Sequence, residues 1–522
     1  MQARARVLTS GVAALILLAL GFGQPAGALR VGDRKQLFID RRFIESTDNV
    51  TLRVNPPVKA GIVLDNEHPW EAGWVGGGSV VDDGGTYRMW YRTMEEGRDG
   101  KLGATRTGYA TSTDGLHWTK PSLGLVEFQG SRANNLIDAP SGSVFLDPKA
   151  PPEQRFKMVV HAHQDDLTRA GLYIRYSADG LHWTLHDVRL FPFACDTDNQ
   201  AFYDERIGKY VAYFRVWDPW RKVGRIETGD ILRPWPMKPI ERPNYLWGKR
   251  RPPTPSTEVE TVFSYDDADP AVTDIYTPGV HRYPWADDAY FMFPSIYRHF
   301  PEPAGGDSPA GYGTHAVTSP DSQGHYRNDG VLDIQLAAGR DGVHWDRYDR
   351  RSYIELGVDG MADSRSMYIL IGWIRRGGEI YQYYAGYDHF HGEYAGFKRL
   401  RGMGAIVRTV QRLDGFVSAD ADYRGGSLTT PLVEFAGSRL ELNAQTAATG
   451  DVRVELADAR GVALPGFAAA DCDPLLGNHL ARTVTWRGRA DLGALAGKPV
   501  RLVFRLRNAK LYAFQFRSQI PS

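Results

Sequence analysis

The phrase Asp-Gly-x-His-Trp occurs three times in this chain and constrains its fold more than any other feature. The copies begin at Asp114, Asp179 and Asp341, and each ends a longer stretch of strand and turn signals. An Asp-Gly turn suits the end of a strand, because glycine adopts positive φ at no steric cost and aspartate accepts hydrogen bonds from nearby backbone N–H groups. Repeated units of this kind predict an array of similar β-sheets.

Five such units follow one another along the chain, at residues 74–118, 143–183, 199–235, 274–345 and 364–416. Each contains a short apolar strand, an Asp- or Gly-rich turn, an aromatic-rich strand, a loop and an alternating strand that ends in Asp-Gly or its remnant. In the third unit, Thr228, Gly229 and Asp230 are such a remnant. The pattern predicts an all-β protein in which residues 29–424 form a five-bladed β-propeller.

The aspartates of the repeated phrase admit a structural and a functional interpretation. In the structural one, the carboxylate caps backbone N–H groups and the tryptophan packs between neighbouring blades; in the functional one, Asp114, Asp179 and Asp341 are catalysts or metal ligands. A residue that recurs once per blade serves a need that all blades share. We therefore favour the structural interpretation and expect the chemistry where the repeats differ.

The sequence pattern changes after residue 424, where short segments of alternating polar and apolar residues replace the long loops. Val500, Leu502 and Phe504 alternate with Arg501 and Arg505, the period of a half-buried strand. The pattern predicts a β-sandwich over residues 425–522. We expect it to pack against the propeller, and a carbohydrate-binding role is the alternative.

Several phrases carry a resemblance to a known family. YRMWYR, DGLHW, DIYTPGVHRY, DGFVSADA and AKLYAFQF are similar to phrases of exported bacterial proteins described as glycoside hydrolase family 32-like. A five-bladed propeller followed by a β-sandwich resembles family 32 itself, the invertase and fructanase type, and the related arabinanases and mannoside phosphorylases. The resemblance extends from about Asp33 to the end of the chain, and it implies a glycoside hydrolase.

The catalytic motifs of family 32 do not match this sequence. The Asn-Asp-Pro-Asn-Gly motif is replaced by a stretch whose carboxylates are Asp65, Glu67 and Glu71, and the Arg-Asp-Pro motif is missing as well. Where the family has a Glu-Cys pair, this chain has Cys195 beside Asp196. The invertase-type catalytic residues therefore cannot be assigned by motif.

Propeller geometry supplies the candidate catalytic residues instead. The N-terminal ends of the innermost strands converge on the mouth of a central funnel. This argument places five carboxylates there: Glu71, Asp196, Asp198, Asp274 and Asp363. Cleavage of a glycosidic bond needs one protonated carboxyl group and one ionised carboxylate. Asp196 and Asp198 could instead cap a turn. Asp274 begins a predicted strand, and because aspartate has low sheet propensity, its presence there favours a functional role.

The predicted substrate-binding residues are Trp70, Trp74, His161, His163, Arg215 and Trp217. Each tryptophan could instead pack between blades. The His161-x-His163 spacing resembles a metal pair, but no third ligand of comparable strength is evident, so substrate contact or a structural role is favoured. No cofactor is required; Ca²⁺ on the propeller axis is the metal that the convergence of carboxylates and carbonyls would allow.

The N-terminus resembles an export signal. Arg4 and Arg6 precede an apolar run over residues 12–20, and a small-x-small site ends at Ala28. We expect a signal peptide over residues 1–28 and a secreted or periplasmic protein; an uncleaved anchor is the alternative, although the apolar run is short for a bilayer. The two cysteines, Cys195 and Cys472, are either buried free thiols or a bridge.

The composition limits the classes of molecule that the protein is expected to bind. Lys and Arg total 62, equal to Asp and Glu together, which argues against nucleic acid. Aromatic residues make up 12% of the chain, which suits stacking on sugar rings. We therefore expect an exported glycoside hydrolase that acts on poly- or oligosaccharides with a pair of funnel carboxylates, without a membrane partner after signal cleavage. The alternative is a non-catalytic carbohydrate-binding propeller, and a protein-interaction propeller has the least support.

Overall fold

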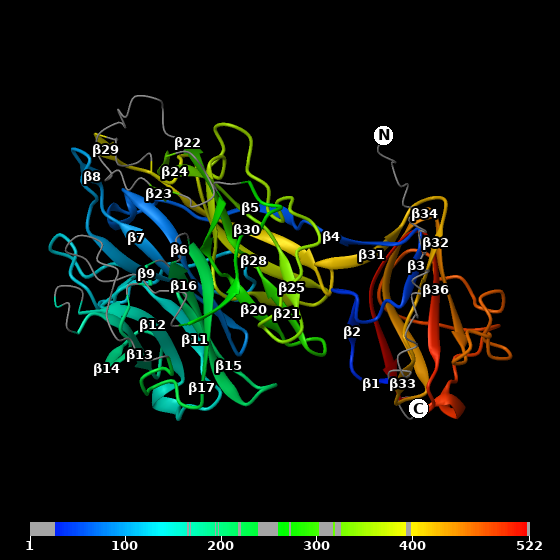
Figure 1. The fold of residues 1–522 in the computed structure, drawn as a ribbon. Helices are drawn as coiled ribbons and strands as arrows, with labels where there is room; N and C mark the ends of the chain where they lie inside the picture. The colour runs from blue at the N-terminus through cyan, green and yellow to red at the C-terminus, as the bar shows by residue number, and fades with distance from the viewer. Residues whose placement is uncertain are drawn as a thin grey trace, which may run out of the picture.

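The structure is a computed structural model that describes residues 27–163, 166, 169–193, 195–196, 198–217, 221–237, 259–270, 273–301, 317–318, 325–392 and 398–518. The predicted signal peptide lies almost wholly outside these residues. Within them the chain is all-β, and its helical segments are short 3-10 turns: η1 (Pro69–Glu71), η2 (Pro152–Gln154) and η4 (Gly493–Leu495). Figure 1 shows a larger unit of sheets in a propeller-like arrangement, and a smaller unit beside it that contains the C-terminal strands.

Three four-stranded antiparallel sheets of the larger unit correspond to the first three sequence units. The first sheet consists of β6 (Trp74–Asp83), β7 (Thr86–Met94), β9 (Thr105–Ser112) and β10 (Leu136–Ile137). The second consists of β11 (Ser143–Leu146), β12 (Phe156–Ala162), β13 (Gly171–Ser177) and β14 (Thr184–Phe191). The third consists of β15 (Gln200–Asp204), β16 (Lys209–Trp217), β17 (Arg221–Thr228) and β18 (Glu260–Phe263).

The fourth large sheet has nine strands and contains strands of both remaining sequence units. Its strands are β19 (Thr273–Thr277), β22 (Ser295–Pro301), β24 (His325–Ile334), β26 (Ser366–Ile369), β28 (Glu379–Tyr387), β30 (Ala405–Arg412) and β5 (Val58–Leu64), with β23 (Val317–Thr318) and β27 (Ile374–Arg376) at its side. Leu332 of β24 pairs in parallel with Ser366 of β26 and joins the two halves. The expectation of five separate blades is therefore corrected to four sheets, because a single parallel register pair fuses units four and five.

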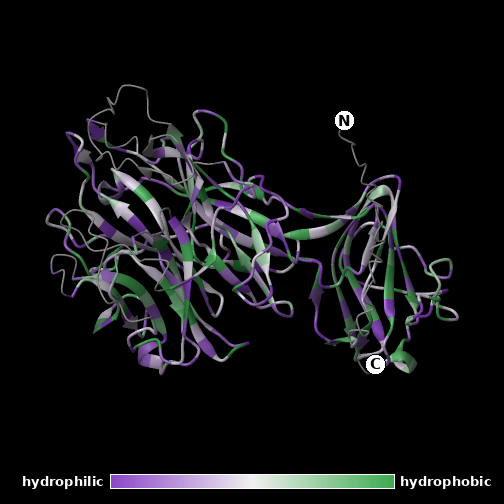
Figure 2. Ribbon diagram, viewed as in Figure 1, coloured by the Kyte–Doolittle hydropathy of each residue, from purple (hydrophilic) through white to green (hydrophobic). Residues whose placement is uncertain are grey.

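Two small sheets complete the larger unit. One is formed by β20 (Val280–Tyr283), β21 (Ala289–Met292) and β25 (Ala337–Gly339), and the other by β8 (Gly97–Arg98) and β29 (Arg399–Leu400). In β7 the consecutive residues Met89, Trp90 and Tyr91 are all buried, so this strand of the larger unit is covered on both sides. Figure 2 shows hydrophobic and hydrophilic residues mixed along the strands of both units.

The smaller unit is built from both ends of the described chain. One sheet of eight strands contains β2 (Gln36–Leu37), β3 (Ser46–Asp48), β4 (Thr51–Val54), β31 (Val417–Ala421), β32 (Gly426–Thr429), β34 (Arg439–Ala457), β35 (Asn478–Thr483) and β36 (Arg501–Arg517). Two further strands, β1 (Leu29–Gly32) and β33 (Val433–Phe435), form a separate two-stranded parallel sheet. The strand pairing links these eight strands into one sheet, and the predicted β-sandwich stays a prediction. Residues 29–54 were predicted to belong to the propeller, but their strands pair with strands of this smaller unit.

The Asp-Gly turns of the repeated phrase join neighbouring units to one another. Gly180 accepts a hydrogen bond of 2.7 Å from Trp90 Nε1 of the unit before it, and Gly342 accepts one of 2.7 Å from the Tyr213 hydroxyl. Tyr383, in the last unit, donates in the same way to Gly115 in the first, also at 2.7 Å. The third of these bonds closes the array into a ring.

The aspartates of these turns are occupied by the turns themselves. Asp114 Oδ1 accepts from the backbone N–H groups of Leu116 and His117 at 2.8 and 2.9 Å, and its Oδ2 lies 2.8 Å from His117 Nδ1. Asp179 and Asp341 make the same contacts in their own turns. The hydrogen bond from the His117 ring, followed by those from the backbone, lowers the pKa of Asp114 well below its usual range. The structural interpretation of the phrase is confirmed.

Replacing Gly342 with Ala tests how much the contact between units stabilises the fold. Gly342 has φ +74°, and an added Cβ would lie 2.5 Å from the Tyr213 hydroxyl. Gly124 has nearly the same φ, +71°, but nothing lies within 4 Å of an added Cβ. We expect Gly124→Ala to cost about 1 kcal/mol of backbone strain. Gly342→Ala should cost about 2 kcal/mol more, because it also displaces a buried hydrogen-bond donor.

Urea-induced unfolding of the two variants beside the wild type measures this difference. Equal losses in both variants would mean that the contact between Tyr213 and Gly342 contributes no stability.

Candidate functional site

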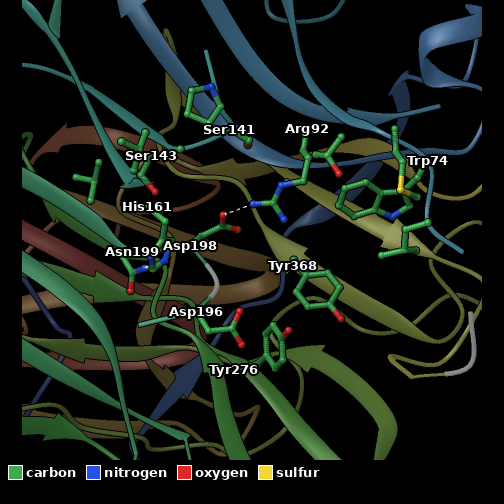
Figure 3. Close-up of a pocket in the computed structure, with 18 of the residues that line it drawn as sticks. Trp74, Arg92, Ser141, Ser143, His161, Asp196, Asp198, Asn199, Tyr276 and Tyr368 are labelled. Carbon is green, nitrogen blue, oxygen red and sulfur yellow. Dashed lines mark hydrogen bonds and ion pairs between the residues drawn. The ribbon is translucent and has the colours of Figure 1, made fainter. Parts of the chain in front are cut away.

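A cavity of about 450 Å³ opens where the inner strands of the sequence units meet. Its lining includes Trp74 of β6, Ser143 of β11, Asp196 and Asp198 just before β15, Tyr276 of β19 and Tyr368 of β26. These strands come from all five sequence units, and Figure 3 shows their side chains around one space. The repeated phrases are elsewhere, so the cavity is built from residues that differ between units.

Asp198 is the first carboxylate of the cavity. Its Oδ1 accepts a hydrogen bond of 3.0 Å from the Arg92 guanidinium, which reaches over from β7 (Figure 3). The side chain is 20% exposed. A Cβ added to Gly77 would lie 3.2 Å from Asp198 Oδ2, so the carboxylate lies against a glycine of β6. The Arg92 guanidinium therefore holds this carboxylate in position at the cavity.

Asp196 is the second carboxylate and is far more accessible. Its side chain is 63% exposed, yet it forms a 2.6 Å ion pair with Arg215, whose side chain is almost fully buried. The backbone at Asp196 has φ +39°, which turns the chain just before β15. Arg215 also donates to the Tyr276 carbonyl at 2.6 Å and lies 4.3 Å from the centre of the Tyr276 ring. The buried guanidinium of Arg215 therefore holds the exposed Asp196 carboxylate in position.

Further polar side chains lie on the same side of the cavity. His161 of β12 lines it, and its Nε2 is 3.3 Å from the Asn199 side-chain nitrogen. Asn199 Oδ1 accepts from the backbone of Arg215 at 3.3 Å. Ser141 and Ser143 add hydroxyl groups to this wall. Such groups suit the hydroxyls of a sugar.

Aromatic rings form the opposite side. Trp74 stacks on Tyr387 with ring centres 5.7 Å apart and planes at 12°, and Tyr276 contacts Tyr368 edge to face. The Tyr368 hydroxyl lies 2.6 Å from His391 Nδ1. Burial, together with the charges of Arg221 and Arg215, lowers the pKa of His391 to about 3. His391 is therefore neutral at ordinary pH.

Asp274 lies beneath this cavity rather than in its lining. Its side chain is fully buried, and its Oδ2 accepts from Arg221 at 2.8 Å and lies 3.2 Å from His299 Nε2. Burial alone would raise the pKa of Asp274, but the charges of Arg221 and His299 outweigh it and lower that pKa to about 2. Arg221 also lies 5.3 Å from the Tyr276 ring. Asp274 thus balances a second buried cation under the aromatic side.

Glu71 is also buried away from the lining. Its Oε1 accepts from the Tyr91 hydroxyl at 2.5 Å, and its Oε2 accepts from Lys120 at 2.9 Å and from the backbone of Glu67 and His68. These bonds fix the start of η1.

Asp363 is a third predicted carboxylate outside the lining. It accepts from Tyr384 at 2.7 Å and pairs with Lys59 of β5 at 2.5 Å. This pair ties the 357–363 segment to the outer strand of the nine-stranded sheet.

The predicted substrate-binding residues also separate into two groups. Trp74 and His161 line the cavity, and Arg215 supports it through Asp196. Trp70 is buried and donates to Asn135 at 2.9 Å, while His163 pairs with Asp187 at 2.7 Å. The Trp217 side chain lies outside the described residues.

Sequence reasoning missed Arg92, Tyr276, Tyr368, Tyr387 and His391. Arg92 and its partner Asp198 are 106 residues apart, and no local pattern connects them. The tyrosines fall in aromatic-rich strands, where they are indistinguishable from core residues. The signal available was the tyrosine content of the fifth unit.

The described residues contain no group of three or more His, Cys, Asp or Glu side chains placed to hold a metal ion. Calcium on the propeller axis stays a prediction. Both cysteines are buried and unbridged. No helix in the described part of the chain is long and apolar enough to cross a membrane.

No family model and no curated protein matches the chain. Among solved structures it is similar to a glycoside hydrolase, with TM-score 0.43 and 14% identity over 68% of this chain and 92% of that one. An N-acetylgalactosamine deacetylase from F. plautii, in complex with blood group B trisaccharide, has TM-score 0.43 and 13% identity over 70% and 96%. A glycosyl hydrolase from Bacteroides ovatus has TM-score 0.39 and 15% identity over 73% and 97%. Likenesses this distant assign neither an activity nor a substrate to this chain.

Asp274→Asn and Asp198→Asn should affect stability very differently. The first removes the charge that balances the buried Arg221, and we expect a loss of about 3 kcal/mol in the free energy of unfolding. The second leaves a partner, Arg92, that is 30% exposed, and should cost less than about 1 kcal/mol.

The difference between the wild type and Asp274→Asn should also depend on pH. Because the folded pKa of Asp274 is lowered to about 2, its stabilisation is complete above the unfolded value near 3.8 and is lost as the pH falls through about 2. Urea unfolding at pH 7, 5 and 3 measures it. A loss below 1 kcal/mol at pH 7 would show that Asp274 is not the balancing charge described above.

Proposed function

We propose that this protein is a glycosidase that binds poly- or oligosaccharides in the cavity and cleaves them with Asp198 and Asp196. The observation that carries the proposal is the pair of carboxylates, two residues apart, whose side chains reach into one open cavity beside stacked aromatic rings (Figure 3). Hydrolysis of a glycosidic bond requires two carboxyl groups that flank the bond. Aromatic rings and neutral polar groups are what a sugar ring needs for binding.

The environment of each carboxylate limits its role. Asp198 is the less exposed of the two and is held by Arg92, so we assign it the group that attacks the sugar or activates water. Asp196 is held by Arg215 and reaches solvent, from which a proton can be exchanged. Asp196 and Asp198 together are the proposed catalytic pair. The pH dependence of the hydrolysis rate shows which of them is the acid and which is the base.

The proposal extends to features that the sequence predicted. The protein is exported after cleavage at Ala28, and it is family 32-like, with the nine-stranded sheet equivalent to two blades. A single register pair between Leu332 and Ser366 supports this equivalence, because each half of the sheet is antiparallel within itself.

One observation favours the alternative of a carbohydrate-binding propeller without catalysis. Among the described residues that line the cavity, Asp196 and Asp198 are the only carboxylates, and both are paired with arginine. Carboxylates held by arginine bind sugar hydroxyls well, and such binding needs no catalytic step.

Activity toward a broad panel of oligosaccharides and aryl glycosides, measured with the mature protein, tests the proposal. We expect hydrolysis by the wild type and a loss of at least about 100-fold in Asp198→Asn and in Asp196→Asn, because each removes a group that takes part in the reaction. Asp187→Asn is the matched control, since Asp187 is exposed, pairs with His163 and Arg169, and does not line the cavity.

Two results would change the conclusion. Hydrolysis that survives in both cavity variants would move the chemistry elsewhere. No hydrolysis across the panel, together with retention of the protein on polysaccharide, would establish the binding module.

A further inference from the structure

The two sides of the cavity differ in a way that the proposed chemistry does not need. One side carries the polar residues Asp196, Asp198, Asn199 and His161, together with the buried Val159, Val160 and Leu172. The other continues from the aromatic rings into an apolar wall formed by Trp74, Met94, Leu102 and Met403. Thioether and alkyl groups cannot replace the water that a sugar hydroxyl loses on binding, so this wall is unsuited to the hydroxyl-bearing edge of a sugar.

The apolar wall is held in place by the sheets beneath it. Trp74 and Met94 are register partners on β6 and β7, and Trp74 forms a parallel bridge with Met403. Met403 donates its backbone N–H to Gly73 at 3.0 Å and accepts from Val75 at 3.0 Å. Met94 and Met403 are buried, whereas Leu102 is 48% exposed and forms the outer part of the wall. A preformed apolar surface of this kind binds without the cost of ordering it.

Arg92 connects the wall to the proposed catalytic carboxylate. Its guanidinium lies 5.7 Å from the centre of the Trp74 ring and donates to Asp198 at 3.0 Å. A group that contacts the wall therefore lies next to Asp198 and close to the bond that this carboxylate would act on.

We propose, on the basis of the function proposed above, that the substrate presents an apolar group to this wall, on or beside the sugar at the scissile bond. Two kinds of glycoside have such a group: those with an aromatic aglycone, and those of 6-deoxy sugars, whose methyl replaces a hydroxymethyl group. In both, the apolar group contacts Leu102 and the two methionines while the sugar hydroxyls face Asp196, Asp198 and Asn199. Methionine adapts to either shape, because its side chain is flexible and polarizable.

Binding of paired ligands tests this inference. The first pair is the methyl and 4-nitrophenyl glycosides of one sugar, and the second is the methyl glycosides of L-galactose and L-fucose, which differ only at C6. Titration calorimetry in the Asp196→Asn background measures dissociation constants without turnover and keeps the contact between Arg92 and Asp198. We expect about a tenfold preference for the nitrophenyl ligand or about a threefold preference for the 6-deoxy sugar, and the larger preference identifies the source.

Leu102→Ser should lower a tenfold nitrophenyl preference to about threefold, or abolish a threefold 6-deoxy preference, because it removes the exposed part of the wall. Leu476→Ser is the matched control, since Leu476 is 59% exposed and lies in the smaller unit. Equal binding within both pairs, or a preference that Leu102→Ser leaves unchanged, would overturn the inference.

A ligand without sugar separates this inference from the proposed function. If none of the glycosides binds, the proposed function fails, and saturation-transfer NMR with benzyl alcohol examines the wall alone. Transfer to the aromatic protons in the wild type and its loss in Leu102→Ser would support the wall as an apolar site. No transfer in the wild type would overturn it.

Discussion

The hydrogen bond from a buried aromatic side chain to the glycine carbonyl of a neighbouring turn is the interaction on which the larger unit depends. Trp90, Tyr213 and Tyr383 each donate one, and each ring packs where the next unit begins. The last of them joins the final unit to the first, and β5 pairs with β30 to complete the nine-stranded sheet from the start of the chain. Because the ring is closed in this way, the inner strands of all units end around one cavity.

Charge balance beneath the cavity links its floor to its carboxylates. Asp274 pairs with Arg221, Arg221 and Arg215 both lie near the Tyr276 ring, and Arg215 pairs with Asp196. Two buried cations therefore lie near the same ring, and each is balanced by one aspartate, Asp274 in the interior and Asp196 in the open site. Burial, together with the charges of the two arginines, lowers the pKa of His391. The ion pair with Arg215 makes Asp196 part of a supported network rather than an isolated surface residue.

Part of the site could be predicted from the sequence, because the alignment of units locates the ends of the inner strands. Asp196, Asp198, Trp74 and His161 line the cavity as expected. The same alignment could not show that partners distant in sequence enclose Glu71, Asp274 and Asp363; Lys120, Arg221 and Lys59, respectively, hold these carboxylates. Burial of a charge depends on what packs over it, and periodicity along one strand does not contain that information.

The sequence by itself determined that the chain is all-β, that it consists of repeated units, and that the aspartate of each repeated phrase caps its own turn. These properties are local, since turn chemistry and strand periodicity act over a few residues. Only the tertiary structure decided that two units share one nine-stranded sheet, that residues 29–54 pair with the C-terminal strands, and that Arg92 meets Asp198. Each of these depends on contacts between segments far apart in the chain, which form only when the ring closes and the two ends of the chain meet.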